Sequence, residues 1–259
     1  MSPTQLYLDR CSDLIVNASR QYSTLCAAAQ RFAQTILSGR MVHLFGSGHS
    51  RIMVEEMWPR YGSFPGFHPM VELSLSYHHP VVGSNGQRQA MYLENVSGLA
   101  ERILRNYQFQ AQDSALVISS SGCNVVPIEM AEGFQQRGVF VVALISSAHS
   151  QASRSQRPDG KKLSDFADLI LDTGAPVGDS MVTLPNLETP VAPGSTVGGC
   201  IIVNCLKAEI AQLLVSNGQP PRVLTAGAVV GQQRASQLFE EAYDEHGRRM
   251  AGLYATLGL

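Results

Sequence analysis

Two short loops carry residue types that bind anions. The loop 46–50 reads Gly-Ser-Gly-His-Ser, and the loop 119–124 reads Ser-Ser-Ser-Gly-Cys-Asn. Glycines let a ligand approach the backbone, and N–H groups at the start of a helix donate hydrogen bonds to an anion together with serine hydroxyls. We therefore predict a site for a phosphate monoester that uses no formal positive charge. Its predicted contacts are Ser47, Gly48, His49, Ser50, Ser119, Ser120, Ser121 and Asn124.

Other functions of these loops match the spacing less well. The serines could simply cap helices, and for either loop taken alone this alternative stays open. A dinucleotide site needs a third glycine at position 51, where this chain has Arg51, although Glu72 could take the place of the ribose-binding acid. The lysine of a P-loop is missing, which excludes a Walker-type nucleotide site.

The elements that must position the two loops are predicted from the spacing of apolar residues. Short apolar runs alternate with amphipathic stretches, which favours a doubly wound parallel sheet in a three-layer α/β fold. In a flavodoxin-like strand order, the first and third strands flank the switch point, so both loops would line one crevice. The predicted strands are 41–45, 71–75, 115–119, 139–145 and 169–172, and the predicted helices between and after them are 51–58, 95–106, 125–137 and 196–216.

Long helical patterns at both ends complete the predicted domain. Apolar residues fall three or four apart from 6 to 37, which predicts one long helix or two helices broken near 19–23. A second amphipathic pattern runs over 232–257. We predict a single domain over 1–259, with an N-terminal helical extension over 1–39 and a C-terminal helix over 228–259.

Three further segments bear on the predicted site and sheet. The apolar helix 196–216 begins at Ser195 or Thr196, and these hydroxyls could close the phosphate pocket or only cap the helix. The polar stretch 146–164 is predicted to be a surface loop. The short run 222–226 is predicted to be an edge strand.

Composition narrows the expected partners and compartment. The 19 Lys and Arg and the 21 Asp and Glu give a net charge of −2, with neither sign in long blocks, so we expect neither nucleic acid nor a membrane as partner. The charged fraction of 15% is low, which favours a surface partly covered by further subunits. The chain shows no signal-peptide pattern, and its five cysteines are never spaced as C-x-x-C. We expect a cytoplasmic protein without disulfide or cofactor.

The two loops together resemble the paired motifs of SIS (sugar isomerase) domains. That resemblance rests on G-x-G-x-S at 46–50, on S-x-S-G-x-N at 119–124, and on the helix-to-strand segment 131–145 that follows the second motif. It covers about residues 5–230. The resemblance implies a five-stranded parallel SIS fold, phosphosugar binding, and a homodimer or homotetramer with sites at subunit boundaries.

One branch of this family, the phosphoheptose isomerases, is similar over a longer segment. Residues 55–61, Glu-Glu-Met-Trp-Pro-Arg-Tyr, resemble the E-E-L-x-x-R-Y sequence that follows the first loop in that branch, while 168–180 resembles uncharacterised single-domain members. This chain departs from the branch at three points. The distance from the first loop to the two glutamates is shorter by about one turn, Asn124 replaces the usual Thr or Ser, and the helix 196–216 lacks a histidine.

The resemblance implies an aldose–ketose isomerase that works through an enediol, in which one group moves a proton between adjacent carbons. Glu56 is the candidate base, and we expect burial to raise its pKa; the alternative is a solvated surface charge. His79 is the candidate second group, in competition with His49 and His78. A metal site built from these histidines and His68 lacks zincin spacing, so no metal is expected.

Two other functions stay open beside the isomerase. SIS domains also serve as phosphosugar sensors in regulators, although this chain has no basic recognition helix. A SIS-type lyase or etherase would use similar glutamate chemistry beside a carbonyl group.

Overall fold

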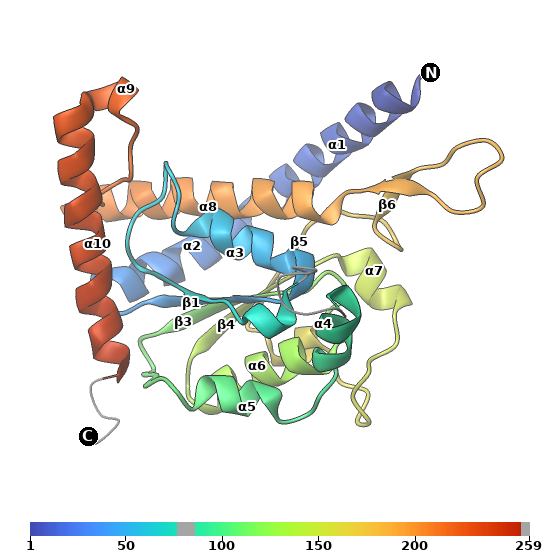
Figure 1. Cartoon of the computed structure of the whole chain (residues 1–259), viewed down its shortest axis with the longest axis horizontal. Helices are drawn as coiled ribbons and strands as arrows, with labels where there is room; N and C mark the ends of the chain where they lie inside the picture. Colours follow the sequence, from blue (N-terminus) through green and yellow to red (C-terminus); the bar gives the residue numbers. More distant parts are fainter. Residues whose placement is uncertain (77–85, 255–259) are drawn as a thin grey trace.

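Five parallel strands form the centre of this computed structural model, which describes residues 1–76 and 86–254. The strand order is β2-β1-β3-β4-β5, which confirms the predicted flavodoxin-like arrangement. Helices cover both faces of the sheet, so the structure has the predicted three layers (Figure 1). The strands are β1 (Val42–Gly46), β2 (Phe67–Met70), β3 (Ser114–Ile118), β4 (Phe140–Ile145) and β5 (Leu169–Asp172).

Alternation along each strand divides the core into two halves. Along β1, Leu44 packs with α2 (Tyr22–Leu37), α3 (Arg51–Met57) and α8 (Ser195–Ser216), while Phe45 packs on the opposite face with α6 (Val125–Gln136). Because successive strand residues point to opposite faces, a strand buried on both sides must be apolar throughout. β4 meets this requirement, while β1 and β3 each hold one buried polar residue, His43 and Ser114, whose side chains are hydrogen-bonded to His68 and Thr35. On the second face, α5 (Leu99–Leu104) packs beside α6.

Helix α8 is long and apolar enough to cross a membrane by length and composition alone. In the fold it packs against α2 and α3 instead. Its side chains Ile202, Val203 and Leu206 are fully buried in the core of the first face. The apolar composition of α8 is therefore that of a core helix.

The N-terminal pattern forms two helices, α1 (Pro3–Arg20) and α2, separated at Gln21. The break lies against the sheet, because the Gln21 side chain accepts from the Asp172 N–H at 2.7 Å and donates to the Asp172 carbonyl at 2.8 Å. Beyond this contact α1 projects from the body of the molecule, near the antiparallel hairpin of β6 (Ser180–Val182) and β7 (Val191–Pro193) (Figure 1). The C-terminal pattern forms α9 (Gly227–Val230) and α10 (Gln232–Tyr254).

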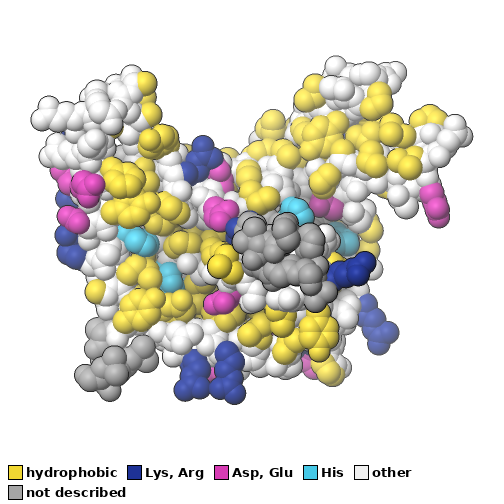
Figure 2. All heavy atoms as spheres, viewed as in Figure 1, with side chains coloured by type: hydrophobic (Ala, Val, Ile, Leu, Met, Phe, Trp, Pro, Cys, Tyr) yellow, Lys and Arg dark blue, Asp and Glu magenta, His cyan; other side chains and the backbone are white. Residues whose placement is uncertain are grey.

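Hydrophobic side chains gather on the surface around the β6–β7 hairpin (Figure 2). On α1, Leu8, Ile15 and Val16 are exposed, while Leu14 packs against Met181 of the hairpin. Exposed apolar faces of this kind are typical of surfaces that bind other chains. The homodimer or homotetramer expected from the sequence stays a prediction.

Several predicted elements are corrected by the structure. The second strand is β2 and not 71–75, where the short helix η2 (Leu73–Leu75) lies. As an edge strand, β2 pairs only with β1 and can hold Pro69, so its sequence lacks the continuous apolar run of a central strand. The predicted edge strand 222–226 is an extended segment that is hydrogen-bonded to the loop 62–63 through Leu224.

The remaining differences concern helices. The predicted helix 95–106 is replaced by α4 (Gln87–Leu93) and α5, separated by Gly98 in the left-handed conformation. The predicted surface loop 146–164 contains α7 (Ser147–Ala152), and the short helix η3 (Leu163–Phe166) extends past its end. The β6–β7 hairpin was not predicted, because its strands are three residues each and too short to show a period.

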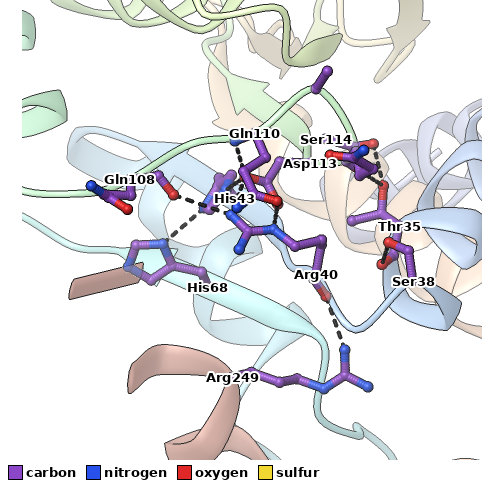
Figure 3. A network of polar contacts seen from close by, with 12 residues as sticks. Thr35, Ser38, Arg40, His43, His68, Gln108, Gln110, Asp113, Ser114 and Arg249 are labelled. Atoms are coloured by element: carbon purple, nitrogen blue, oxygen red, sulfur yellow. Dashed lines mark hydrogen bonds and ion pairs between the residues drawn. The ribbon is translucent and has the colours of Figure 1, made fainter. Parts of the chain in front are cut away.

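A network of buried polar groups lies at the amino ends of the strands (Figure 3). Arg40 binds Asp113 through two hydrogen bonds of 2.7 Å, and Asp113 is fully buried. Burial alone would raise the pKa of Asp113, but His43 and Arg40 lower it to about 2. His43 Nδ1 lies 2.9 Å from His68 Nδ1, so one of the two imidazoles must donate and the other must accept.

The position of Asp113 decides this tautomer. Its carboxylate lies 3.5 Å from His43 Nε2, which favours the proton on Nε2 and makes His43 Nδ1 the acceptor of the His68 N–H. Burial lowers the pKa of His43, and burial together with the neighbouring His43 lowers that of His68 well below its usual value. Burial therefore favours the neutral form of both imidazoles.

We predict that the protein loses stability as the pH falls from 7.5 to 5.5. Imidazoles with lowered pKa values bind protons in the unfolded chain before they do so in the fold, so the free energy of unfolding should fall over this range. The carboxylate of Asp113 does not contribute to this change. Because its pKa is lowered in the fold, it stabilises the folded protein above about pH 4, and that stabilisation is lost only at lower pH. Urea unfolding at both pH values measures the change.

The variant H68N tests the assignment. The asparagine amide can still donate to His43 Nδ1, but it does not titrate, so the pH-dependent loss of stability should be smaller in H68N than in the wild type. An unchanged pH dependence in H68N would contradict the assignment.

Candidate functional site

A cavity of about 380 Å³ opens at the carboxyl ends of the strands. It is formed where the loops after β1 and β3 meet α4, α7 and the start of α8, which lie at the same end of the sheet (Figure 1). Both predicted anion-binding loops therefore face one cavity. Its lining residues are Ser47, His49, Ser50, Met53, Glu94, Ile118, Ser119, Ser120, Ser121, Asn124, Leu144, His149, Thr173, Asp179, Pro193, Ser195 and Thr196.

The predicted binding residues thus come together, except that Gly48 does not itself line the cavity. Gly48 shapes the loop instead, because its φ of +54° is one that glycine adopts without strain. Gly46 allows a second close approach, since a methyl group added there would lie 2.7 Å from the Ser50 carbonyl oxygen. The role of all these residues in binding a ligand stays a prediction.

The loop after β3 is held open by its own serines. Ser119 Oγ accepts from the Gly122 N–H, and Ser121 Oγ accepts from the Cys123 N–H, each at 3.2 Å. These bonds fix the loop before α6 begins. Ser120 differs from both neighbours, because its hydroxyl is buried and has no hydrogen-bond partner in the part of the chain that the structure describes.

Backbone donors of the same loop are also unused. Within residues 1–76 and 86–254, the N–H groups of Ser120, Ser121 and Asn124 have no hydrogen-bond acceptor. Polar groups that line a cavity without a protein partner are satisfied by water or by a ligand. The geometry therefore offers four donors on one wall of the cavity, three N–H groups and the Ser120 hydroxyl.

The start of α8 is already occupied by a carboxylate of the chain. Asp179 accepts from the Ser195 N–H at 2.6 Å, from the Ser195 hydroxyl at 2.8 Å and from the Gly194 N–H at 3.1 Å. Negative charge at a helix N-terminus is stabilised by the helix dipole. Asp179 therefore takes the position at α8 that an anionic ligand would otherwise fill.

Three lining residues with titratable side chains were not among the predicted site residues. Glu94, at the end of α4, is buried and accepts from Asn124 Nδ2 at 2.5 Å. His149 comes from α7 and accepts the Gly178 N–H on Nδ1 at 3.1 Å. Asp179 precedes the hairpin. The resemblance of 168–180 to family members was the only signal in the sequence that touched one of the three.

Glu56 lies outside the residues that line the cavity, beyond Met53 along α3. It accepts from Asn204 Nδ2 at 2.9 Å and forms ion pairs with Arg60 and Lys207. Burial alone would raise its pKa, but the hydrogen bonds from Asn204 and Arg60 and the charge of Lys207 lower it. The expected rise in the pKa of Glu56 is therefore wrong, while its catalytic role stays a prediction.

The candidate histidines are distributed over the fold. His49 is exposed at the cavity, while His68 is buried in the network at the opposite end of the strands. His78 and His79 lie outside the described residues, so the predicted role of His79 stays a prediction. Across residues 1–76 and 86–254, no three His, Cys, Asp or Glu side chains are placed to hold a metal ion.

Comparison with known proteins places this fold in a family. The model of the SIS domain matches residues 6–146, which is more than half of the chain. The protein belongs to the SIS domain family. The assignment confirms the resemblance seen in the two loops and the five-stranded SIS fold.

Relatives of similar length share about a third of their residues with this SIS-domain protein. A UPF0309 protein of Listeria innocua is 32% identical over 218 residues, covering 84% of this chain and 86% of the relative. A UPF0309 protein of Halalkalibacterium halodurans is 33% identical over 211 residues, covering 82% and 85%. The match therefore extends past the region of the family model into α8.

Solved structures support the same fold. The phosphoheptose isomerase of Neisseria gonorrhoeae has a TM-score of 0.50 at 13% identity, covering 81% of this chain and 97% of that one. A phosphoheptose isomerase of Francisella tularensis has a TM-score of 0.50 at 16% identity, covering 81% and 96%. At these identities the similarity is one of fold.

We predict that G46A destabilises the protein by about 1–3 kcal/mol, because its methyl group would overlap backbone atoms of Ser50 that cannot move independently of the loop. Urea unfolding measures the change. G247A is the matched control: its methyl group meets no atom within 4 Å on α10, so it should stabilise the helix by up to about 1 kcal/mol. A G46A protein as stable as the wild type would show that the first loop can relax.

Proposed function

We propose that this protein binds a phosphosugar in the cavity, with the phosphate ester on the loop after β3. The observation that carries the proposal is the set of donors without partners on that loop: the N–H groups of Ser120, Ser121 and Asn124 and the buried Ser120 hydroxyl, none of which has an acceptor among the described residues. A phosphate ester offers three acceptor oxygens, and such concave groups of backbone N–H donors bind phosphate well.

Neighbouring donors are already in use, which limits where the phosphate can lie. In the first turn of α6, the Val126 N–H donates to the Glu94 carbonyl at 2.8 Å and the Val125 N–H to Asn95 Oδ1 at 3.4 Å. The first turn of α8 is capped by Asp179. The loop before α6 therefore has N–H donors available for an anion, beside the loop after β1 on the same cavity.

Neutral donors predominate around this place. The described lining residues include no lysine and no arginine. Phosphate would be held by amide N–H groups and hydroxyls, as the sequence predicts. The rest of the cavity, with a carboxylate, imidazoles and further hydroxyls, provides polar partners for the hydroxyl groups of a sugar.

The chemistry that we propose for the bound sugar is aldose–ketose isomerisation through an enediol. A carboxylate removes a proton from the carbon next to the carbonyl and returns it to the adjacent carbon. Asp179 uses both of its oxygens to hold the start of α8, and Glu56 is engaged in ion pairs outside the cavity lining. Glu94 is buried, lines the cavity and accepts from Asn124 Nδ2, so we propose Glu94 as the base in place of the predicted Glu56.

We predict that S120A weakens phosphosugar binding about 10- to 100-fold, because a hydrogen bond to a charged group contributes roughly 1.5–3 kcal/mol. Calorimetric titration with fructose 6-phosphate and sedoheptulose 7-phosphate measures the affinity, and unphosphorylated fructose should not bind measurably. S236A, at an exposed position of α10, is the control and should bind as the wild type does. If S120A and the wild type bind with equal affinity, the proposed position of the phosphate on this loop is wrong.

Proton exchange in deuterated water tests the isomerase. We expect the wild type to exchange the C1 or C2 proton of a bound phosphosugar, and E94Q to lose at least about 100-fold of that rate, since general base catalysis contributes this much. E56Q should keep most of it. If E56Q loses proton exchange and E94Q keeps it, Glu56 is the base and the assignment to Glu94 is wrong.

The same experiment separates the other two functions. Binding without exchange in the wild type would identify a sensor. Loss of a group from C3 would identify a lyase or etherase.

A further inference from the structure

Helix α7 contributes one histidine, His149, to the lining of the cavity. His149 lies in this six-residue helix, which follows β4. Its imidazole lines the cavity together with the loop after β3. The phosphate position proposed on the loop after β3 does not by itself give this imidazole a specific role.

Two strand ends hold α7 in place. Ser147 N–H donates to Asp172 Oδ1 at 2.9 Å, and the same oxygen accepts from Gly174 N–H at 3.0 Å. The Ser146 hydroxyl donates to the Ala175 carbonyl at 2.7 Å and is fully buried. The start of α7 and the segment after β5 are therefore one hydrogen-bonded unit.

This unit is also attached to the predicted phosphate loop. The Ser146 N–H donates to the Ser120 carbonyl at 2.9 Å. The carbonyl of Ser120 is thus used on one side, while its N–H and hydroxyl have no partner in the described part of the chain. The start of α7 lies directly beside the proposed phosphate position.

The imidazole itself is fixed by the segment after β5. His149 Nδ1 accepts the Gly178 N–H at 3.1 Å, so in the neutral ring the proton is on Nε2. A ring held at one nitrogen presents the other as a donor in a constant orientation. His149 therefore has the form of a preoriented N–H donor at the cavity.

We propose that His149 is a ligand-binding residue whose Nε2–H donates to the phosphate ester of the bound phosphosugar. The inference rests on the proposed function. The described lining residues include no lysine or arginine, so the neutral Nε2–H of His149 adds one more uncharged donor to a wall of amide N–H groups and hydroxyls. The link between Ser146 and Ser120 places α7 on the phosphate side of the cavity.

Two substitutions separate the two nitrogens of the ring. In H149N, the amide oxygen can still accept from Gly178, but nothing occupies the Nε2 position. In H149Q, the amide N–H₂ group reaches the Nε2 position, while the contact with Gly178 is lost. Q151A, at an exposed position of α7 outside the cavity, is the control.

Calorimetric titration with fructose 6-phosphate and sedoheptulose 7-phosphate gives the expected order. H149N should bind about 10- to 100-fold more weakly than the wild type, as expected for a lost hydrogen bond to a charged group. H149Q should bind more tightly than H149N, and Q151A should match the wild type. Inorganic phosphate should shift the Nε2 resonance of His149 in ¹⁵N-histidine-labelled wild-type protein and leave that of the buried His68 unchanged.

The outcomes distinguish this inference from the function on which it rests. If the wild type binds neither sugar phosphate, the proposed function fails. If the wild type binds and H149N binds equally well, only the role of His149 is overturned. A loss confined to H149Q would assign His149 to holding the loop at Gly178 and would also overturn the inference.

Discussion

The pairing of β1 with β3 is the constraint on which the site depends. Gly46 lies opposite Ile118 in the parallel register, so the two strands end side by side. Neighbouring strands are about 4.8 Å apart, and the next residues, Ser47 and Ser119, both line the cavity. Segments more than 70 residues apart in the chain are thereby brought to one wall by backbone hydrogen bonds alone. Any change that shifted this register would separate the two loops.

Buried polar groups have different hydrogen-bonding partners at the two ends of the sheet. At the amino ends, Arg40, Asp113 and the two buried imidazoles pair with one another, although His43 Nε2 lies 3.5 Å from Asp113 and makes no hydrogen bond within the described part of the chain. At the carboxyl ends, the hydroxyl of Ser120 and nearby N–H groups lack partners among the described residues. The polar groups at the amino ends stabilise the fold. The donors without partners at the carboxyl ends are the ones that we propose bind a ligand.

Sequence patterns predicted the parts of this structure that are governed by local physics. Continuous apolar runs and the Gly/Ser loops after them identified β1, β3 and β4, and nine of the ten predicted binding residues line the cavity. Edge strand β2 was misplaced because it needs no such run. Glu94, His149 and Asp179 come from separate segments that meet only through tertiary hydrogen bonds, such as those made by Asp172. Glu56 was misjudged for a similar reason, since Asn204 and Lys207, which lower its pKa, lie about 150 residues away.

The β6–β7 hairpin is closed at its base by Asp179 and Gly194. The Gly194 N–H donates to the Asp179 carbonyl at 3.0 Å and lies 3.1 Å from its carboxylate. These contacts at the base hold the first turn of α8 in place, so a change in the residues between the two strands need not move it. Lengthening such a tip costs only a slowly growing closure entropy. An insertion or deletion at 183–190 would therefore change the length of the tip while the contacts of Asp179 keep Ser195 in place.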